Sequence, residues 1–287
     1  MDDINDIRTF YDDKAQQEEQ RLAEHQLEFD ITWRWLMQVL PEGGHILELG
    51  AATGRYTLPL AECGYNVTAL DLSIQATELS RAKAQQAGLE SRIEYVVGDA
   101  RDLSCLGNTQ YDAALVMGPL YHLVEEAERR LVLSQVYQTL KPGAPMISAF
   151  ICRIGILADL MPEGGYWINE EDEVACILRE GCDPPDYHRG GFRGYFCRPE
   201  ELIPLHESVG FQTLAVAAAE PCIGADDVSY NALVEPQRSR WLDLLYRVST
   251  EPSLLGASRH LLYIGRKPEL QSETDADNSG NVFDFRR

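Results

Sequence analysis

The stretch that decides the fold is HILELGAATGRYTLPLAECGYNVTALDLS, residues 45–73. A short apolar run, residues 45–49, leads into a glycine-bearing turn and then into a helix-like segment that Gly64 closes. A second apolar run follows at residues 66–70. Short buried runs that alternate with helical segments are typical of βαβ units, whose parallel strands are covered on both faces. The stretch therefore predicts the start of an α/β sheet.

The same alternation continues as far as residue 151 and resumes near the C-terminus. It predicts a Rossmann-like, doubly wound, mostly parallel sheet of seven strands, preceded by a helical segment over residues 1–40. The predicted strands are 45–49, 66–70, 93–97, 113–117, 145–151, 211–217 and 260–267. The predicted helices that follow the strands are 56–63, 73–87, 125–140, 199–209 and 236–249.

Changes in composition divide the chain into five parts. After the sheet core comes an acidic insert rich in Gly, Pro and aromatic residues, which is expected to form a lid because loops carry specificity on a rigid scaffold. The polar C-terminal stretch has little core material and is expected to be a disordered tail. The parts are an N-terminal helical cap 1–44, the core 45–151, the lid and substrate insert 152–198, the completion of the sheet with a helical insert 199–268, and the tail 269–287.

The net charge limits the partners. The chain has 287 residues with 25 Lys and Arg against 46 Asp and Glu, which gives a formal net charge of −21. A surface this acidic repels phosphate backbones and anionic lipid, so neither a nucleic-acid partner nor a membrane partner is expected. A small-molecule substrate remains, and the sequence does not indicate an oligomeric state.

Features of the ends and the cysteines predict a cytoplasmic protein. Met1 leads directly into Asp2 and Asp3 rather than into a signal peptide, and no apolar run reaches 18 residues. The seven cysteines show no CxxC spacing and are expected to be reduced. No metal site is predicted, because the spacing of Cys176, Cys182, His188 and Cys197 matches no familiar zinc motif.

Polar residues that could bind a nucleoside follow the first three predicted strands. The turn after the first strand has Gly50, but Ala52 and Arg55 stand where a dinucleotide fingerprint needs glycine. Asp71 and Asp99 end the next two strands, where a carboxylate can accept hydrogen bonds from a ribose diol or other nucleoside donors. Alternatively, Asp71 or Ser73 caps the following helix.

The ordered set of motifs resembles class I S-adenosylmethionine-dependent methyltransferases. The set comprises residues 48–54 (ELGAATG), Asp71, residues 98–100 (GDA) and residues 111–117 (YDAALVM). The segment Gly-Pro-Leu-Tyr-His-Leu, residues 118–123, is similar to one in a group of bacterial-type small-molecule methyltransferases. The N-terminal helix also resembles theirs, in Tyr11, Arg21, His25, Glu28 and Thr32. The resemblance covers about residues 10–151, and Ala52 departs from the usual glycine.

The resemblance implies S-adenosylmethionine as cofactor and S-adenosylhomocysteine as product. Asp71 would hold the ribose diol, Asp99 would accept from the adenine amine, and Glu48 would orient the loop or meet the amino group. Arg21 would close over the pocket together with Tyr11, although a surface ion pair of Arg21 with Glu18 or Glu24 is an alternative. The implied cofactor-binding residues are Tyr11, Arg21, Glu48, Gly50, Ala51, Gly54, Asp71, Leu72, Asp99, Ala100 and Met117.

The resemblance implies methyl transfer to a nitrogen or oxygen atom of a metabolite. His122 is the best candidate for a base because histidine titrates near neutral pH, but it could equally line the pocket or be structural. Tyr121 lies beside it. His45, His206 and His260 are expected to be ordinary positions.

The acceptor itself is not identified by the sequence. Its candidate contacts are His25, Tyr166, Trp167 and Tyr195, although the acidic run around these aromatic residues could simply be a solvated face. Two other functions stay open: a catalytically silent S-adenosylmethionine-binding regulator and, less favoured, a nicotinamide-dependent oxidoreductase.

Overall fold

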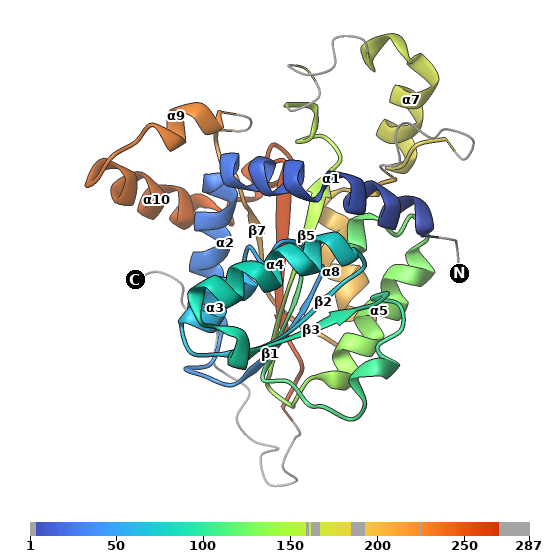
Figure 1. Ribbon diagram of the computed structural model, residues 1–287. Helices are drawn as coiled ribbons and strands as arrows, with labels where there is room; N and C mark the ends of the chain where they lie inside the picture. Colours follow the sequence, from blue (N-terminus) through green and yellow to red (C-terminus); the bar gives the residue numbers. More distant parts are fainter. Residues whose placement is uncertain (1–3, 159–160, 162–166, 185–192, 224–225, 270–287) are drawn as a thin grey trace, which may run out of the picture.

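The computed structural model describes residues 4–158, 161, 167–184, 193–223 and 226–269. One sheet organises them, in the order β3-β2-β1-β4-β5-β8-β7, with β6 paired to the far end of β5 (Figure 1). β1 to β5 are parallel, whereas β8 runs antiparallel to both β5 and β7. The strands are β1 His45–Leu49, β2 Asn66–Asp71, β3 Ile93–Val97, β4 Ala113–Val116, β5 Pro145–Cys152, β6 Phe196–Cys197, β7 Gln212–Ala218 and β8 His260–Arg266.

The predicted α/β, mostly parallel, Rossmann-like fold is confirmed, but the sheet has eight strands rather than seven. The additional strand, β6, contains two residues that pair with Ile151 and Cys152. The Arg153 guanidinium helps to hold it there, because Nε donates to the Phe196 carbonyl at 2.9 Å. A strand of two residues has no alternation of apolar and polar positions for a sequence pattern to detect.

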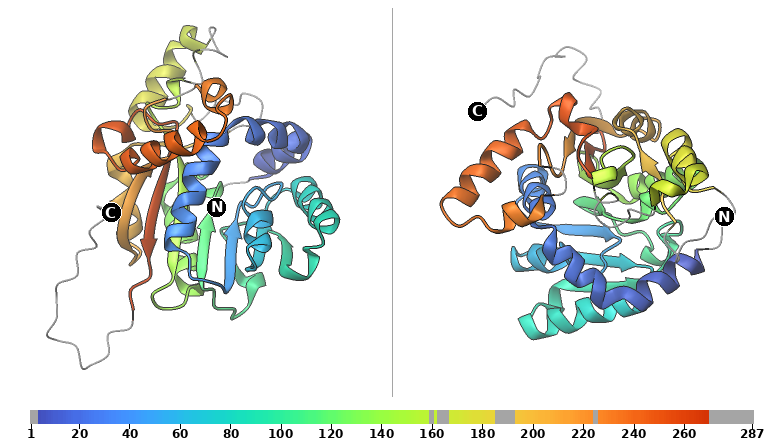
Figure 2. Two further views of the ribbon diagram at one scale, coloured as in Figure 1. Left: turned by 90° about the vertical axis from the view of Figure 1, so that its left-hand side faces the viewer. Right: turned by 90° about the horizontal axis from the view of Figure 1, so that it is seen from above.

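Helices cover both faces of the sheet (Figures 1 and 2). On one face lie α2, α3, α4 and α10, and on the other lie α5 and α8. The α-helices are α1 Asn5–Glu24, α2 Gln26–Val39, α3 Thr57–Glu62, α4 Ile74–Ala87, α5 Glu126–Thr139, α7 Glu171–Glu180, α8 Pro199–Glu207, α9 Asp227–Asn231, α10 Gln237–Val248 and α11 Pro252–Leu255. Short 3-10 helices are η1 Glu90–Arg92, η2 Ser104–Leu106, η3 Pro119–Tyr121 and η4 Trp167–Asn169. Of the helices in the described ranges, none combines the length and the apolarity needed to cross a membrane.

Side chains on the two faces of the sheet pack into two separate apolar layers. In β1, Ile46 packs into the layer under α2 and α3, while Leu47 and Leu49 pack into the layer under α5 and α8. All three side chains are fully buried. Successive side chains of a strand point to opposite faces, so a strand covered on both sides must be apolar throughout. This requirement explains why the buried strands were readable from the sequence.

The N-terminal segment is two helices rather than one continuous helix. The chain breaks at His25, whose φ of −89° and ψ of 61° end α1 and begin α2. α2 presents Leu27, Ile31 and Leu36 to the sheet, whereas α1 has only Ile7 and Ala15 buried. α1 instead runs alongside α4, over the edge of the sheet where β1 to β4 end (Figures 1 and 2).

The predicted lid insert is only partly within the described residues. Its helix α7 packs Ile177 against Ile151 and Phe196, and it lies beyond the same edge of the sheet as α1 (Figure 1). Of the predicted tail, only Glu269 is among the described residues.

Candidate active site

A cavity lies at the edge of the sheet where the parallel strands end, beneath α1. Ligands of open α/β sheets bind at this edge. The cavity extends from Gly98–Ala100 after β3, past Asp71 and Glu48, to Met117–Pro119 after β4, and ends at Ala149 of β5 and His260 of β8.

The turn after β1 brings backbone close to the cavity. Gly50 has a φ of +76°, and a Cβ atom there would lie 2.7 Å from Pro119 Cδ, so only glycine fits. Ala52 also adopts a left-handed φ, +45°, and its N–H donates to Asp71 Oδ2 at 2.7 Å. The turn is thus held in place by the carboxylate that ends β2.

Gly54 has a different role from Gly50. It is absent from the cavity lining among the described residues, and a Cβ atom on it would collide with Ser80 Oγ of α4. With a φ of +88°, Gly54 allows α4 to pack close to the turn.

Asp71 lines the cavity, and Ser73 caps α4. The Ser73 hydroxyl accepts from the Ala76 N–H at 3.0 Å, which is the capping bond. Asp71 Oδ1 accepts from the Ser73 N–H at 2.8 Å. Burial raises the pKa of Asp71, and backbone hydrogen bonds from Ser73, Ala52 and Leu72 oppose the rise. A carboxylate has about four acceptor sites, so one remains for a ligand donor.

Asp99 is anchored by Arg101, a residue that the sequence reasoning missed. Arg101 Nε and Nη2 donate to Asp99 Oδ2 at 2.9 and 2.8 Å, and the Arg101 N–H donates to Oδ1 at 2.8 Å. Arg101 Nη1 is in turn bound to Glu128 at 2.6 Å. Arg101 Nε is also 3.2 Å from Oδ1, so Arg101 engages both carboxylate oxygens and fixes their orientation at the cavity wall. Ala100 and Leu72 also line the cavity.

Glu48 is a buried acid at the floor of the cavity. Its Oε2 accepts from Thr57 Oγ1 at 2.6 Å, and burial raises its pKa to about 8. The carboxyl is therefore largely protonated at neutral pH and can donate a hydrogen bond as well as accept one. Met117, Gly118 and Ala51 line the cavity nearby.

Helix α1 closes the cavity from above. Tyr11, Glu18 and Arg21 all line it, and Arg21 forms the expected ion pair with Glu18 at 2.7 Å. The Arg21 side chain therefore lines the cavity and forms the ion pair at the same time, so the two alternatives predicted for it are compatible. Asp12 Oδ1 accepts from Ser73 Oγ at 2.6 Å and from the Gln75 N–H at 3.1 Å, which joins α1 to the start of α4.

His122 is buried and has both ring nitrogens in hydrogen bonds. The Arg193 carbonyl can only accept, so Nδ1 carries the hydrogen and donates to it at 2.8 Å. Nε2 then accepts from the Tyr11 hydroxyl, also at 2.8 Å. Burial lowers the pKa of His122 to about 4, so the ring is neutral. Tyr121 lies beside it in the lining, and burial raises its pKa.

The end of the cavity beneath α2 contains residues that the sequence reasoning had not placed at the site. His260, expected to be an ordinary position, lines it together with Glu28, Thr32 and Arg55. His260 Nδ1 is 2.7 Å from Glu220 Oε1. Burial lowers the pKa of His260, but attraction to Glu220 outweighs it and brings the pKa to about 9. No local signal marked His260, because only the pairing of β8 with β5 brings it to this edge.

One ligand atom from each of Glu28, Glu220 and His260 lies within 4.8 Å of the other two, a grouping that could hold a metal ion. However, Arg259 is buried 3.5 Å from Glu220, and His260 is already bound to it. These side chains compensate the Glu220 charge. His260, with its pKa of about 9, is protonated at neutral pH and offers no lone pair to a metal ion.

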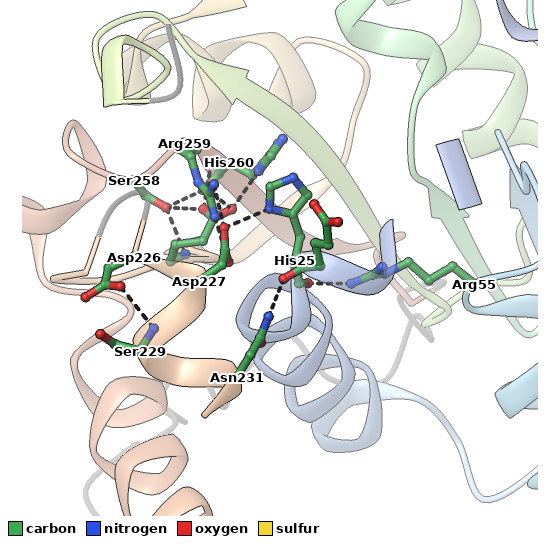
Figure 3. Close-up of polar contacts among 11 residues, drawn as sticks. His25, Arg55, Asp226, Asp227, Ser229, Asn231, Ser258, Arg259 and His260 are labelled. Atoms are coloured by element: carbon green, nitrogen blue, oxygen red, sulfur yellow. Dashed lines mark hydrogen bonds and ion pairs between the residues drawn. The ribbon is translucent and has the colours of Figure 1, made fainter. Parts of the chain in front are cut away.

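Two predicted acceptor contacts lie outside the cavity lining. His25 Nδ1 is 3.0 Å from Asp227 Oδ2, and Asp227 also binds Arg259 (Figure 3). The His25 carbonyl accepts from Arg55 Nη2 at 2.5 Å, which ties the α1–α2 break to the turn after β1 (Figure 3). Tyr195 donates to Glu201 at 2.5 Å and packs its ring against Arg129. Tyr166 and the Trp167 side chain lie outside the described residues.

Comparison with known proteins identifies the domain. Residues 46–143 match the family model described as "Methyltransferase domain". The chain is 27% identical over 262 residues to the tRNA 5-carboxymethoxyuridine methyltransferase of Escherichia coli K12, which covers 86% of this chain and 91% of the relative. It is 25% identical over 200 residues to the ubiquinone biosynthesis O-methyltransferase of Xanthomonas axonopodis pv. citri, 70% of each chain.

Solved structures share the fold. The magnesium protoporphyrin IX methyltransferase of Synechocystis PCC 6803, solved with bound S-adenosylhomocysteine, aligns with a TM-score of 0.59 at 16% identity. The alignment covers 92% of this chain and all of that chain. Residues 46–143 therefore form a methyltransferase domain, and the chain has the fold of S-adenosylmethionine-dependent methyltransferases. It is an enzyme whose cofactor is S-adenosylmethionine.

Proposed function

We propose that the enzyme methylates a nitrogen or oxygen atom of a small molecule, and that the single cavity beneath α1 holds cofactor and acceptor together. The observation that carries the proposal is the extent of this cavity, from Asp99 after β3 to His260 on β8. Adjacent strands lie about 4.8 Å apart, so six strands from β3 to β8 span roughly 24 Å. This length exceeds that of a nucleoside with one amino-acid arm, which leaves the β5–β8 end for an acceptor.

The residues present fit the cofactor along the β3–β4 part of the cavity. Asp71 and Asp99 both line the cavity, and their carboxylate oxygens would accept from the ribose diol and from the adenine amine. Gly50 and Ala51 would admit the methionine arm, Glu48 would meet its amino group and Met117 would lie near the sulfonium, since all four line the cavity. Tyr11 and Arg21 close over it from α1.

The cofactor supplies a methyl group activated by the positive sulfur atom. The chain's task is then to align the acceptor's lone pair with the methyl carbon and to exclude water. His122 serves this task by positioning Tyr11, since both of its nitrogens are already hydrogen bonded. A positioning role for His122 is thus better supported than a role as base.

A small acceptor is better supported than tRNA, although one relative acts on tRNA according to its name. The formal charge of −21 opposes binding of a polyanion. The cavity is also covered by α1, which Asp12 and Glu19 attach to the other wall through Ser73 and Lys83. A metabolite can be enclosed under such a cover, whereas a helical nucleic acid cannot.

Calorimetry and a metabolite screen test the proposal. S-adenosylmethionine and S-adenosylhomocysteine are expected to bind and to raise the melting temperature, while NAD and NADP do neither. A screen for release of S-adenosylhomocysteine is expected to give turnover with a metabolite and none with bulk tRNA. Turnover with tRNA alone would overturn the small-molecule assignment, and binding of NAD alone would overturn the cofactor assignment.

A further inference from the structure

We infer that Glu28 of α2 receives the methyl acceptor and that the acceptor is an amine. The inference rests on the proposed function, in which the β5–β8 end of the cavity holds the acceptor. Glu28 lines this end with Thr32, Arg55, His260 and Leu262.

Glu28 is the carboxylate in this part of the cavity whose charge is not already bound. No described residue forms a hydrogen bond or ion pair with it. Two cationic side chains that line the cavity with Glu28 form ion pairs with other acids: Arg21 binds Glu18 at 2.7 Å, and His260 binds Glu220 at 2.7 Å. A partly buried carboxylate without a partner is costly unless a ligand satisfies it.

Neighbouring atoms support a polar ligand at this wall. Thr32 Oγ1 and Arg55 Nε are buried, and both side chains lie beside the Tyr56 hydroxyl, which also lines the cavity. Thr32 is one turn along α2 from Glu28, so the two side chains lie on one face of the helix. A ligand here would meet a carboxylate, a hydroxyl and an N–H group together.

The direction in which charge moves during methyl transfer favours an amine acceptor over a carboxylate acceptor. In the transfer, the nitrogen lone pair forms a bond to the methyl carbon, the carbon–sulfur bond breaks, and its electron pair returns to sulfur. Positive charge therefore moves from sulfur to nitrogen, and the resulting ammonium later loses a proton to solvent. A carboxylate beside the nitrogen stabilises this developing charge. Beside an anionic oxygen nucleophile, the same Glu28 would be repulsive.

The surroundings also favour a cationic or neutral ligand over an anionic one. The nearby cation His260 is compensated by buried Glu220, and Arg259 is compensated by Asp227 and Glu220. With these pairs neutral overall, Glu28 and Arg55 are the charges at this end that no ion pair compensates. Arg55 Nη2 donates to the His25 carbonyl at 2.5 Å and its guanidinium lies over the Phe29 ring, whereas Glu28 has no such partner among the described residues. The formal charge of the whole chain, −21, acts in the same direction.

Binding measurements with matched ligands test the inference. The complex with S-adenosylhomocysteine is titrated by calorimetry with 2-phenylethylamine, 3-phenylpropanoate and 2-phenylethanol, and then with a panel of metabolite amines and acids. Amines are expected to bind at least tenfold more tightly than acids of the same shape. In Glu28→Gln, amine affinity is expected to fall at least tenfold, while S-adenosylhomocysteine affinity stays within about twofold.

The control is Glu62→Gln, which removes an exposed carboxylate at the end of α3, away from the cavity lining. It is expected to change neither affinity. The inference is overturned if acids bind more tightly than amines, if no amine binds the complex below 10 mM (a limit of about −2.7 kcal/mol), or if Glu28→Gln leaves amine affinity unchanged. Loss of cofactor affinity in Glu28→Gln would place Glu28 at the methionine arm instead. Failure of wild-type protein to bind S-adenosylhomocysteine would be a failure of the proposed function.

Discussion

At the scale of single residues, Asp71 has two tasks that a substitution can separate. Its oxygens hold the Ala52 and Ser73 N–H groups, and they face the place proposed for the ribose. Asp71→Ala is expected to weaken S-adenosylhomocysteine binding by roughly 2–4 kcal/mol, because a charged acceptor for the ribose diol is lost. Asp71→Asn keeps one acceptor oxygen and is expected to lose less. Calorimetry on folded variants measures both, and unchanged affinity in Asp71→Ala would move the ribose elsewhere.

His122 is a second residue whose role kinetics can decide. With Nδ1 bound to the Arg193 carbonyl and Nε2 to Tyr11, its substitution releases Tyr11 rather than removing a base. His122→Asn and Tyr11→Phe are therefore expected to lower kcat/KM by similar factors, about tenfold, and to be non-additive when combined. In a plot of wild-type rate against pH, no change is expected at the pH where a normal histidine titrates. A loss of 10²-fold or more in His122→Asn, with Tyr11→Phe near wild type, would restore the base assignment.

Site residues that directly follow a predicted strand could be predicted from the sequence. Residues that reach the site only through the order of the strands in the sheet could not. Gly50, Asp71 and Met117 adjoin strands that could be read as buried runs, and all three line the cavity. His260 is more than 200 positions from Glu28 in the chain, and antiparallel pairing of β8 places them at one wall. Contacts of this kind have no periodicity in the sequence.

At the scale of elements, α1 is held by polar contacts rather than by a buried apolar face. Asp12 accepts two hydrogen bonds from the start of α4, and Glu19 pairs with Lys83 of the same helix. Asp12→Ala is expected to speed hydrogen exchange in α1 and to raise the dissociation rate of S-adenosylhomocysteine several-fold. Asp13→Ala, at the exposed neighbouring position, is the control and is expected to leave both unchanged. Equal exchange rates in the two variants would show that α1 is held by other contacts.

Strand positions were predicted within one residue for most of the sheet, because β1, β2, β4, β5 and β8 are largely buried apolar runs. The break between α1 and α2 was not predicted. Gln26 and Leu27 continue a helix-compatible pattern, and the chain turns at His25 because distant groups hold it there. Asp227 binds the His25 ring, and Arg55 binds its carbonyl. Such tertiary contacts override local propensity.

At the scale of the whole molecule, buried titratable groups predict how stability depends on pH. Burial lowers the pKa of His122 to about 4 and that of His206 to about 3. Between about pH 5 and 6 the unfolded chain therefore binds nearly two protons that the folded chain does not. Glu48, with its pKa raised by burial to about 8, binds one proton only when folded. The net difference is about one proton, so the free energy of unfolding falls as the pH drops below 6.5.

Above pH 6.5 the sign reverses. His260, with a pKa of about 9 beside Glu220, and Glu48 both hold protons in the folded chain that the unfolded chain has lost. The free energy of unfolding is thus expected to fall again toward pH 8, by about 1.4 kcal/mol per pH unit for each of the two groups. Urea titrations from pH 5 to 8.5 are expected to give a maximum near pH 6.5. In Glu48→Gln the amide still accepts from Thr57 but cannot ionise, so the alkaline decline is expected to become shallower. A profile that rises steadily to pH 8.5 would mean that neither Glu48 nor His260 keeps its proton in the folded chain.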